Sequence, residues 1–211
     1  LLIPAMIGSI GKRTFRNMAR YVDMEEHRFA RQMDKEVGFP DINLEVIREC
    51  KKRDDVVIIA QDSTFIEKAG KKTFGVDFYW NGTAGRVEKG IEVDLVAAVV
   101  MQKGRPTFAL SGKQFVEAKT DQKTEYDEQS SKINFFLDHI KSVLPQIEKL
   151  AAKHVVADGY FYKKNYVNGI INMQLHVVSK LRKDAQLLLS YDGPQKPRGR
   201  RREFEKDKVT E

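Results

Sequence analysis

The sequence has very few of the residues that cross-link a chain or anchor it in a membrane. Among 211 residues there is one cysteine, Cys50, and one tryptophan, Trp80. A single cysteine excludes a disulfide framework and a zinc site built on several cysteines, and it is typical of a reducing compartment. The longest apolar run, 95–101, is far shorter than the ~18 residues that a membrane-spanning helix needs. We therefore expect a protein without a membrane span.

Histidine is scarce as well. The four histidines do not have the spacing with which a helix or loop presents two ligands to one metal ion, so we interpret them as structural or surface residues: His27, His139, His154 and His176. Residues 1–11 are apolar but lack a preceding basic stretch, so they do not resemble a secretory signal. The chain begins with Leu1, and we expect it to be a fragment of a longer reading frame.

Charge is distributed unevenly along the chain. There are 37 Lys and Arg against 30 Asp and Glu, a formal charge of +7. Residues 161–211 hold twelve of the basic and six of the acidic residues, so their net charge of +6 is nearly the whole excess. A hydrophobic fraction of 41% is enough to fill a core and argues against disorder. We expect a folded, near-neutral domain followed by a basic segment.

The first part of the chain has helical periodicity. Phe15 and Met18 recur at helical spacing, and Asp23 with Glu26 has the form of a capping box. A further helical run follows Pro40. We expect residues 1–53 to form a small helical segment whose basic side chains are either solvated or in contact with DNA phosphates.

From residue 56 onward the pattern changes to short strands. Residues 56–60 form a continuous apolar run typical of a buried strand, and further strands are expected at 75–79, 91–101 and 107–110. A helical period starts at Lys132, with Pro145 opening a second helix or kinking the first. The strand 155–157, another helix and the strand 175–179 follow.

This order of elements predicts the fold class. Several sequential strands followed by alternating helices and strands indicate an α/β fold with a mixed sheet flanked by helices. A purely alternating Rossmann chain would not begin with a strand meander. We place the core domain at 54–190 and a basic loop at 191–211.

Two aspartates share one local context. Asp62 follows the run VVIIAQ and Asp158 follows HVVA, so each is expected at the end of a short apolar strand. If the strands are neighbours, the carboxylates meet at one edge of the sheet. Mg²⁺ prefers such oxygen ligands, and two metal ions can support in-line phosphoryl transfer. Alternatively, an Asp after a strand is a turn former or a helix N-cap, and spacing alone leaves these two interpretations about even.

Several stretches carry a resemblance to a known family. They are QDSTF at 61–65, KTFGVDFYWNG at 72–82, VVADGYFYKKNYVNGI at 155–170 and HVVSKLRKDAQL at 176–187. With KRTFRNMARY before them and GPQKPRGR after them, they resemble a bacterial insertion-sequence transposase of the DDE type over 12–202. The resemblance implies a ribonuclease-H-like fold, whose first catalytic carboxylate lies on the central strand and whose second follows the fourth strand. Asp62 and Asp158 match those places.

The resemblance also implies an activity. Asp62 and Asp158 would hold Mg²⁺ (or Mn²⁺) while the enzyme cleaves DNA at transposon ends and joins the freed 3′-hydroxyl to target DNA. Its partner would be double-stranded DNA in the bacterial cytoplasm, at the nucleoid and not at a membrane. A homodimer on DNA is compatible with it. The transposon ends, the target preference and the oligomeric state do not follow from the sequence.

The family's third acid has no counterpart in this chain. That acid is a Glu on a helix after an inserted β-rich segment, within a Tyr…Arg…Glu…Lys signature. Glu203 and Glu205 lie in the basic loop instead. We expect the third acid beyond Glu211, so that residues 191–211 begin the insertion domain and the triad is incomplete here.

Two other functions are therefore considered. A catalytically inactive, DNA-binding remnant of a transposase would also lack the third acid. A haloacid-dehalogenase-like phosphatase also has an Asp after an apolar strand, but it needs a second acid two residues later, where this chain has Thr64.

Basic residues after Asp158 are candidate DNA contacts, because Lys and Arg bind phosphates without reading the sequence. The alternative is a solvated basic surface. These candidates are Lys163, Lys164, Lys180, Arg182, Lys183, Arg198, Arg200, Arg201 and Arg202.

Four further residues have two interpretations each. Asp77 and Asp94 lie in expected strands, and we interpret them as solvent-facing rather than as site acids. Tyr79 and Trp80 precede an Asn-Gly turn. Such aromatic residues either pack in the core or stack on a nucleobase.

Overall fold

The computed structural model describes residues 2–12, 14–33, 35, 37–70, 72–102, 104, 106–116, 125–181 and 188–208. The chain divides into two compact units, Leu1–Ile42 and Asn43–Glu211. The domain limits expected from the sequence, 1–53, 54–190 and 191–211, remain predictions. None of the described helices is both long and apolar enough to span a bilayer.

The first unit is helical. It contains α1 (Leu2–Gly8), α2 (Phe15–Met18) and α3 (Glu26–Met33). Thr14 caps α2 by accepting a hydrogen bond from the Asn17 amide at 3.3 Å. A small core of Ala5, Met18 and Phe29 holds the helices together. Helix α4 (Phe39–Cys50) crosses the unit boundary, and its Leu44 and Ile47 belong to the core of the second unit.

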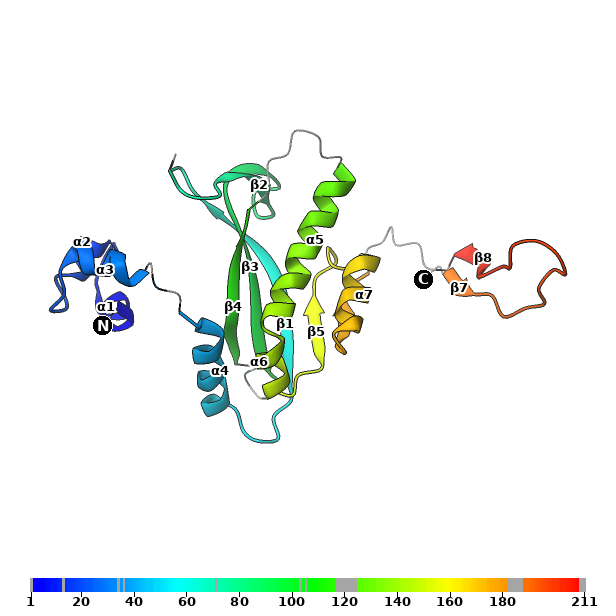
Figure 1. Ribbon diagram of the computed structural model, residues 1–211, viewed down its shortest axis with the longest axis horizontal. Helices are drawn as coiled ribbons and strands as arrows, with labels where there is room; N and C mark the ends of the chain where they lie inside the picture. Colours follow the sequence, from blue (N-terminus) through cyan, green and yellow to red (C-terminus); the bar gives the residue numbers. More distant parts are fainter. Residues whose placement is uncertain are drawn as a thin grey trace. The chain divides into compact units, whose positions relative to one another are not determined.

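The second unit is built on a mixed sheet (Figure 1). Its strands are β1 (Val57–Glu67), β2 (Asp77–Asn81), β3 (Arg86–Val100), β4 (Thr107–Phe115), β5 (His154–Ala157) and β6 (His176–Ser179). The strand order is β2-β3-β1-β5-β6, with β4 also paired to β3. Strands β1 to β4 pair antiparallel, whereas β1, β5 and β6 run parallel. This arrangement confirms the expected ribonuclease-H-like mixed α/β fold.

Strand β1 is longer than the sequence pattern indicated. The apolar run ends at Ala60, but the strand continues through Asp62 to Glu67. β1 continues because it has a long partner. The 15-residue β3 pairs antiparallel with β1 over the whole length of β1, from Val57↔Val100 to Glu67↔Gly90. Asp62 therefore lies in the middle of a strand, and the expectation that it ends one was wrong.

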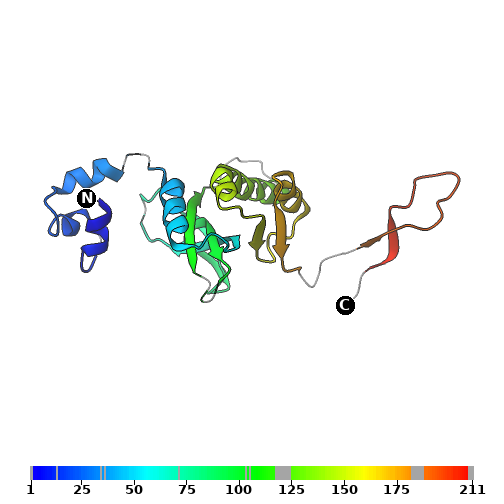
Figure 2. The ribbon, with the colours of Figure 1, turned by 90° about the horizontal axis from the view of Figure 1, so that it is seen from below.

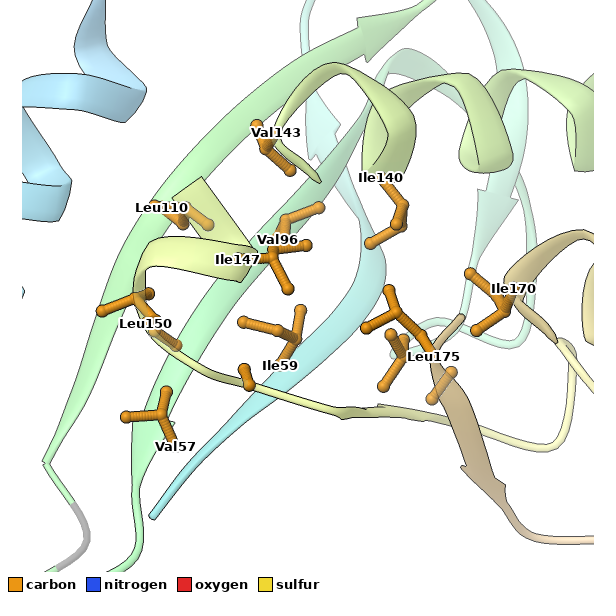
Figure 3. Packing of buried hydrophobic residues seen from close by; sticks show 14 of the residues in the cluster. Val57, Ile59, Val96, Leu110, Ile140, Val143, Ile147, Leu150, Ile170 and Leu175 are labelled. Atoms are coloured by element: carbon orange, nitrogen blue, oxygen red, sulfur yellow. The ribbon is translucent and has the colours of Figure 1, made fainter. Parts of the chain in front are cut away.

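Helices α5 (Glu125–Ser142), α6 (Leu144–Lys149) and α7 (Lys164–Asn172) pack on one face of the sheet (Figure 2). Pro145 lies in the first turn of α6. Of the two interpretations of Pro145, the opening of a second helix is confirmed. Figure 3 shows the core between these layers, where Ile59 and Val96 of the sheet meet Ile140 and Ile147 of the helices.

A buried polar network interrupts this apolar core. Asp94 on β3 and His139 on α5 are both fully buried, and Nδ1 of His139 lies 2.6 Å from Oδ2 of Asp94. Gln61 donates from Nε2 to the same oxygen at 2.7 Å and accepts a hydrogen bond from the Tyr166 hydroxyl. On the other side of the imidazole, Nε2 lies 2.9 Å from Oγ of Ser111. The interpretation of Asp94 as solvent-facing was wrong, because its side chain points toward α5.

The network connects three strands of the sheet to two of the helices that cover it. Gln61 is on β1, Asp94 on β3, Ser111 on β4, His139 on α5 and Tyr166 on α7. A buried polar group without a hydrogen-bond partner costs free energy. Such a network therefore favours one register of these strands and helices over registers shifted by one residue.

A separate hairpin follows the core. Strand β7 (Leu188–Ser190) pairs antiparallel with β8 (Phe204–Lys208). Within the described part of the expected basic loop, residues 191–203 lack regular structure and β8 occupies the positions after them.

We predict that Asp94→Ala destabilises the protein by about 2–6 kcal/mol, because it leaves the buried donors of Gln61 and His139 without an acceptor at roughly 1–3 kcal/mol each. Urea unfolding followed by circular dichroism measures the change. The matched control is Asp138→Ala, an aspartate on α5 outside the network, for which we expect a change within about 0.5 kcal/mol. Equal effects of both substitutions would contradict the role given to the network.

Candidate catalytic site

The sheet register brings the two predicted aspartates together. Strands β1 and β5 are parallel, and Gln61 pairs with Ala157. Asp62 and Asp158 therefore each directly follow a residue of this pair, Asp62 within β1 and Asp158 just after the end of β5. Along β1 the side chains alternate, so Ile59 and Gln61 are buried against the helices while Asp62 is exposed on the opposite face.

The electrostatics of Asp62 indicate that the two carboxylates interact. Partial desolvation raises the pKa of Asp62 above its ordinary value, and the negative charge of Asp158 raises it further. The Ser63 backbone amide opposes both effects by hydrogen bonding, and Asp94 adds a smaller repulsion. Two carboxylates that repel each other in this way are a suitable place for a cation.

The loop after β5 is fixed around Asp158. Oδ1 of Asp158 accepts a hydrogen bond from the Tyr160 amide at 2.8 Å, and its carbonyl oxygen accepts one from the Ser179 hydroxyl at 2.7 Å. Asp158 thus does act as a turn former, which was the alternative interpretation. The turn uses Oδ1 alone for this hydrogen bond, so the role as turn former and a role as metal ligand are compatible.

A pocket of about 550 Å³ opens beside the aspartates. It forms because β5 ends at Ala157 while β1 continues, so among the described strands only β3 pairs with β1 beyond Gln61. The pocket is lined by residues from β1, the β2–β3 hairpin, β3, α5 and the loop after β5: Asp62, Ser63, Thr64, Phe65, Trp80, Asn81, Gly82, Thr83, Glu92, Lys132, Asp158, Tyr160 and Phe161.

Sequence reasoning missed three ionisable members of this pocket, Glu92, Lys132 and Tyr160. Glu92 is buried and its Oε2 lies 2.7 Å from Nζ of Lys132 on α5. That ammonium group lies 5.7 Å from the centre of the Tyr160 ring. Burial raises the pKa of Tyr160, and the charges of Glu92 and Asp158 raise it further. The only sequence signal for Glu92 was an acidic residue inside an apolar strand, which is the same signal that Asp94 gives.

Among the described residues, no third metal-ligating acid joins the two aspartates. In the part of the chain that the structure describes, no three His, Cys, Asp or Glu side chains gather into a group that could hold a metal. Glu203 and Glu205 form ion pairs with Arg200 and Arg202 beside the β7–β8 hairpin. Glu92 lies in the pocket but is neutralised by Lys132.

The candidate DNA-binding residues fall into two groups. Lys163 lies next to the pocket, with Nζ 4.3 Å from the centre of the Tyr160 ring. Lys164 is the first residue of α7, and Lys180 directly follows β6. The second group lies between β7 and β8, where Arg198, Arg200 and Arg201 are exposed.

Three further candidates differ from these two groups. Arg182 and Lys183 lie outside the described residues. Arg202 holds its own loop together, since its guanidinium pairs with Glu205 at 2.9 Å and lies 4.2 Å from the Tyr191 ring centre.

A family model decides which family the chain comes from. The model described as "DDE superfamily endonuclease" matches residues 1–210, which is nearly the whole chain. The chain belongs to the DDE superfamily endonucleases. A paired aspartate site on β1 and after β5 is compatible with this membership. The continuous strand after Asp62 also leaves no nucleophile loop of the haloacid-dehalogenase kind.

Other comparisons add less to the description of this DDE endonuclease chain. No curated protein matches it. Among solved structures it is similar to a chain of the "Crystal structure of a pre-cleavage Mos1 transpososome", with 10% identity, 79% of this chain and 54% of that chain covered, and a TM-score of 0.25. That score is too low to carry an argument. The chain spans about half the length of the solved chain that it matches.

We predict that Asp62→Asn stabilises the metal-free protein at neutral pH. Folding raises the pKa of Asp62 above its ordinary value of 3.8. Asp62 therefore contributes to the free energy of unfolding at pH values below 3.8, and this contribution is lost as the pH rises through the pKa of Asp62 in the folded state. The variant does not titrate there. Thermal unfolding in EDTA should show a higher midpoint than wild type at pH 7 and no difference at a pH below 3.8. A lower midpoint at pH 7 would contradict the repulsion between the two aspartates.

Proposed function

We propose that this DDE endonuclease catalyses metal-dependent phosphoryl transfer on DNA, cleaving at transposon ends and joining the 3′-hydroxyl to a target. The single observation that supports it most is the pairing of Gln61 with Ala157, which makes Asp62 and Asp158 neighbours. Family membership adds the endonuclease class.

The donor set fits Mg²⁺ or Mn²⁺. Both aspartates offer carboxylate oxygens, which hard divalent cations prefer, and the raised pKa of Asp62 indicates an uncompensated negative charge between them. When bound, the metal would supply charge stabilisation at the reacting phosphate and a more acidic water or hydroxyl. Asp62 and Asp158 would hold it.

The remaining residues of the site orient the substrate. The Tyr160 amide holds the Asp158 carboxylate and the Ser179 hydroxyl holds its backbone carbonyl, so the turn keeps a fixed conformation. Lys163 stands at the N-terminal end of α7 beside Tyr160, where its ammonium group can bind a backbone phosphate of the DNA. Preorganised groups of this kind cost no rearrangement when substrate binds.

Partners and location follow as proposals. The partner is double-stranded DNA, as transposon ends and as target, and a homodimer would hold two ends together. The site of action is the bacterial cytoplasm, at the nucleoid.

A second candidate function is an inactive, DNA-binding remnant of a transposase. It is favoured by one observation, that the described residues bring no third acid to Asp62 and Asp158. Poor positioning of a second metal would lower catalysis severely.

We predict that Asp62→Asn and Asp158→Asn each lower Mg²⁺-dependent nicking of supercoiled plasmid by at least about 100-fold, since even the outer-shell partners of metal ligands are worth about 10–100-fold. The matched control is Asp54→Asn, an exposed aspartate in the turn before β1, which should keep wild-type activity. Activity that survives both site substitutions would refute the assignment. DNA binding without any metal-dependent nicking by wild type would support the inactive remnant.

We also predict that Arg198, Arg200 and Arg201 bind DNA phosphates. Replacing all three by Gln should weaken duplex binding and lower the slope of log Kd against log salt by about 0.9 for each phosphate that the variant no longer binds. Fluorescence anisotropy over a salt series measures the slope. The control replaces Lys51, Lys52 and Arg53 by Gln, which removes the same charge elsewhere. If both triple variants change the slope equally, the hairpin arginines act only through net charge.

A further inference from the structure

The only tryptophan of the chain is exposed beside the candidate catalytic site. Trp80 is 63% exposed and still lines the pocket that contains Asp62 and Asp158. Its neighbour Tyr79 is buried, with its hydroxyl bonded to the carbonyl groups of Gly75 and Phe115. The core interpretation therefore holds for Tyr79 and fails for Trp80, because the two side chains point to opposite faces of β2.

Trp80 lies on a well-ordered β-hairpin. Trp80 pairs with Val87 across the β2–β3 hairpin. The turn next to it is closed by Asn81, whose Oδ1 accepts hydrogen bonds from the amides of Thr83 and Ala84 and whose Nδ2 donates to Glu88. The indole thus stands on an ordered hairpin without being covered by it, which is the arrangement that a stacking surface needs.

The rest of the pocket combines an aromatic ring with polar groups. Tyr160 is backed by Phe136 and Phe161, with ring centres 6.2 and 5.6 Å away. The Glu92–Lys132 pair supplies a hydrogen-bond acceptor and a donor close to this ring. Aromatic faces together with a few donors and acceptors are what recognises a nucleobase taken out of its stack.

The charge of the pocket selects the base over the phosphate. Among the described residues, three acidic side chains line the pocket, those of Asp62, Asp158 and Glu92, and Lys132 is the one basic side chain in the lining. A phosphate without a metal ion would be repelled there, whereas a neutral base would not. The volume of about 550 Å³ also lies in the range of pockets that enclose small organic groups.

We propose that this pocket receives one unpaired nucleobase of the DNA, stacked on Trp80, and so brings the adjoining phosphate to Asp62 and Asp158. The proposal rests on the proposed function, because it takes DNA as the substrate, and it names the part of the substrate that the site holds. The enzyme would then act on a nucleotide that has left the double helix.

The test uses Trp80 as its own reporter, since the chain contains no other tryptophan. Two single-stranded probes of equal length and charge are titrated into the full chain without divalent metal, an oligodeoxythymidylate and an oligonucleotide of abasic units. We expect the first to quench the tryptophan fluorescence and the second to leave it unchanged. In anisotropy measurements Trp80→Ala should bind the thymidylate probe about 5- to 150-fold more weakly, the range for one stacked base, and the abasic probe as wild type does.

Two variants separate stacking from other causes. Trp80→Phe keeps an aromatic face and should retain most of the affinity, which also shows that the hairpin tolerates substitution. Phe78→Ala removes another exposed aromatic ring of β2, 67% exposed and outside the pocket, and should bind both probes normally. The proposal is overturned if Trp80→Ala weakens both probes equally or neither, or if Phe78→Ala has the same effect.

The outcome is independent of the catalytic proposal. If base-dependent binding needs Trp80 while Asp62→Asn and Asp158→Asn keep wild-type nicking, the proposed function fails and the base pocket stands. If nicking needs both aspartates while Trp80→Ala binds thymidylate normally, the base pocket fails and the proposed function stands.

Discussion

The whole site depends on the hydrogen bonding of β1 to strands of opposite direction on its two sides. β3 pairs antiparallel with β1 along eleven residues, and β5 pairs in parallel with the short stretch Ile59–Gln61. The antiparallel partner extends β1 past the point where its apolar character ends. The parallel partner sets the register that makes Asp62 and Asp158 neighbours. A slip of one residue would turn Asp62 toward the helices, because side chains alternate along a strand.

The two faces of β1 carry different polar chemistry at adjacent positions. Gln61 points into the core, where Asp94, His139 and Tyr166 satisfy it, while Asp62 points outward toward the candidate metal site. An apolar residue at position 61 would leave Asp94 and Tyr166 without the hydrogen bonds that Gln61 makes to them, which costs free energy in a core. One oxygen of Asp94 is buried without a hydrogen-bond partner among the described residues, so the network has some polar cost of its own.

The pocket results from unequal strand lengths rather than from any one motif. Because β5 stops at Ala157 and β1 goes on, a strip of β1 beyond Gln61 is left open on the side of β5, and the β2–β3 hairpin and the Asp158 loop form its walls. Acidic side chains dominate the lining, so the same cavity favours cations at its carboxylates and neutral groups inside it. Basic candidates for binding the DNA backbone lie outside this lining, in the segment after Asp158 and on the β7–β8 hairpin, so they do not neutralise the aspartates.

By itself the sequence determined the element order, the mixed sheet and the two aspartates, because strand and helix periodicity and the DDE-type motifs are local signals. It could not show that β1 passes Asp62, that Asp94 is buried on His139, or that Glu92 and Lys132 join the pocket, since each depends on a partner far along the chain. The same holds for Tyr79 and Trp80. Tyr79 is buried in the core and Trp80 is exposed, and the pairing of β2 with β3 decides which of the two side chains faces the core.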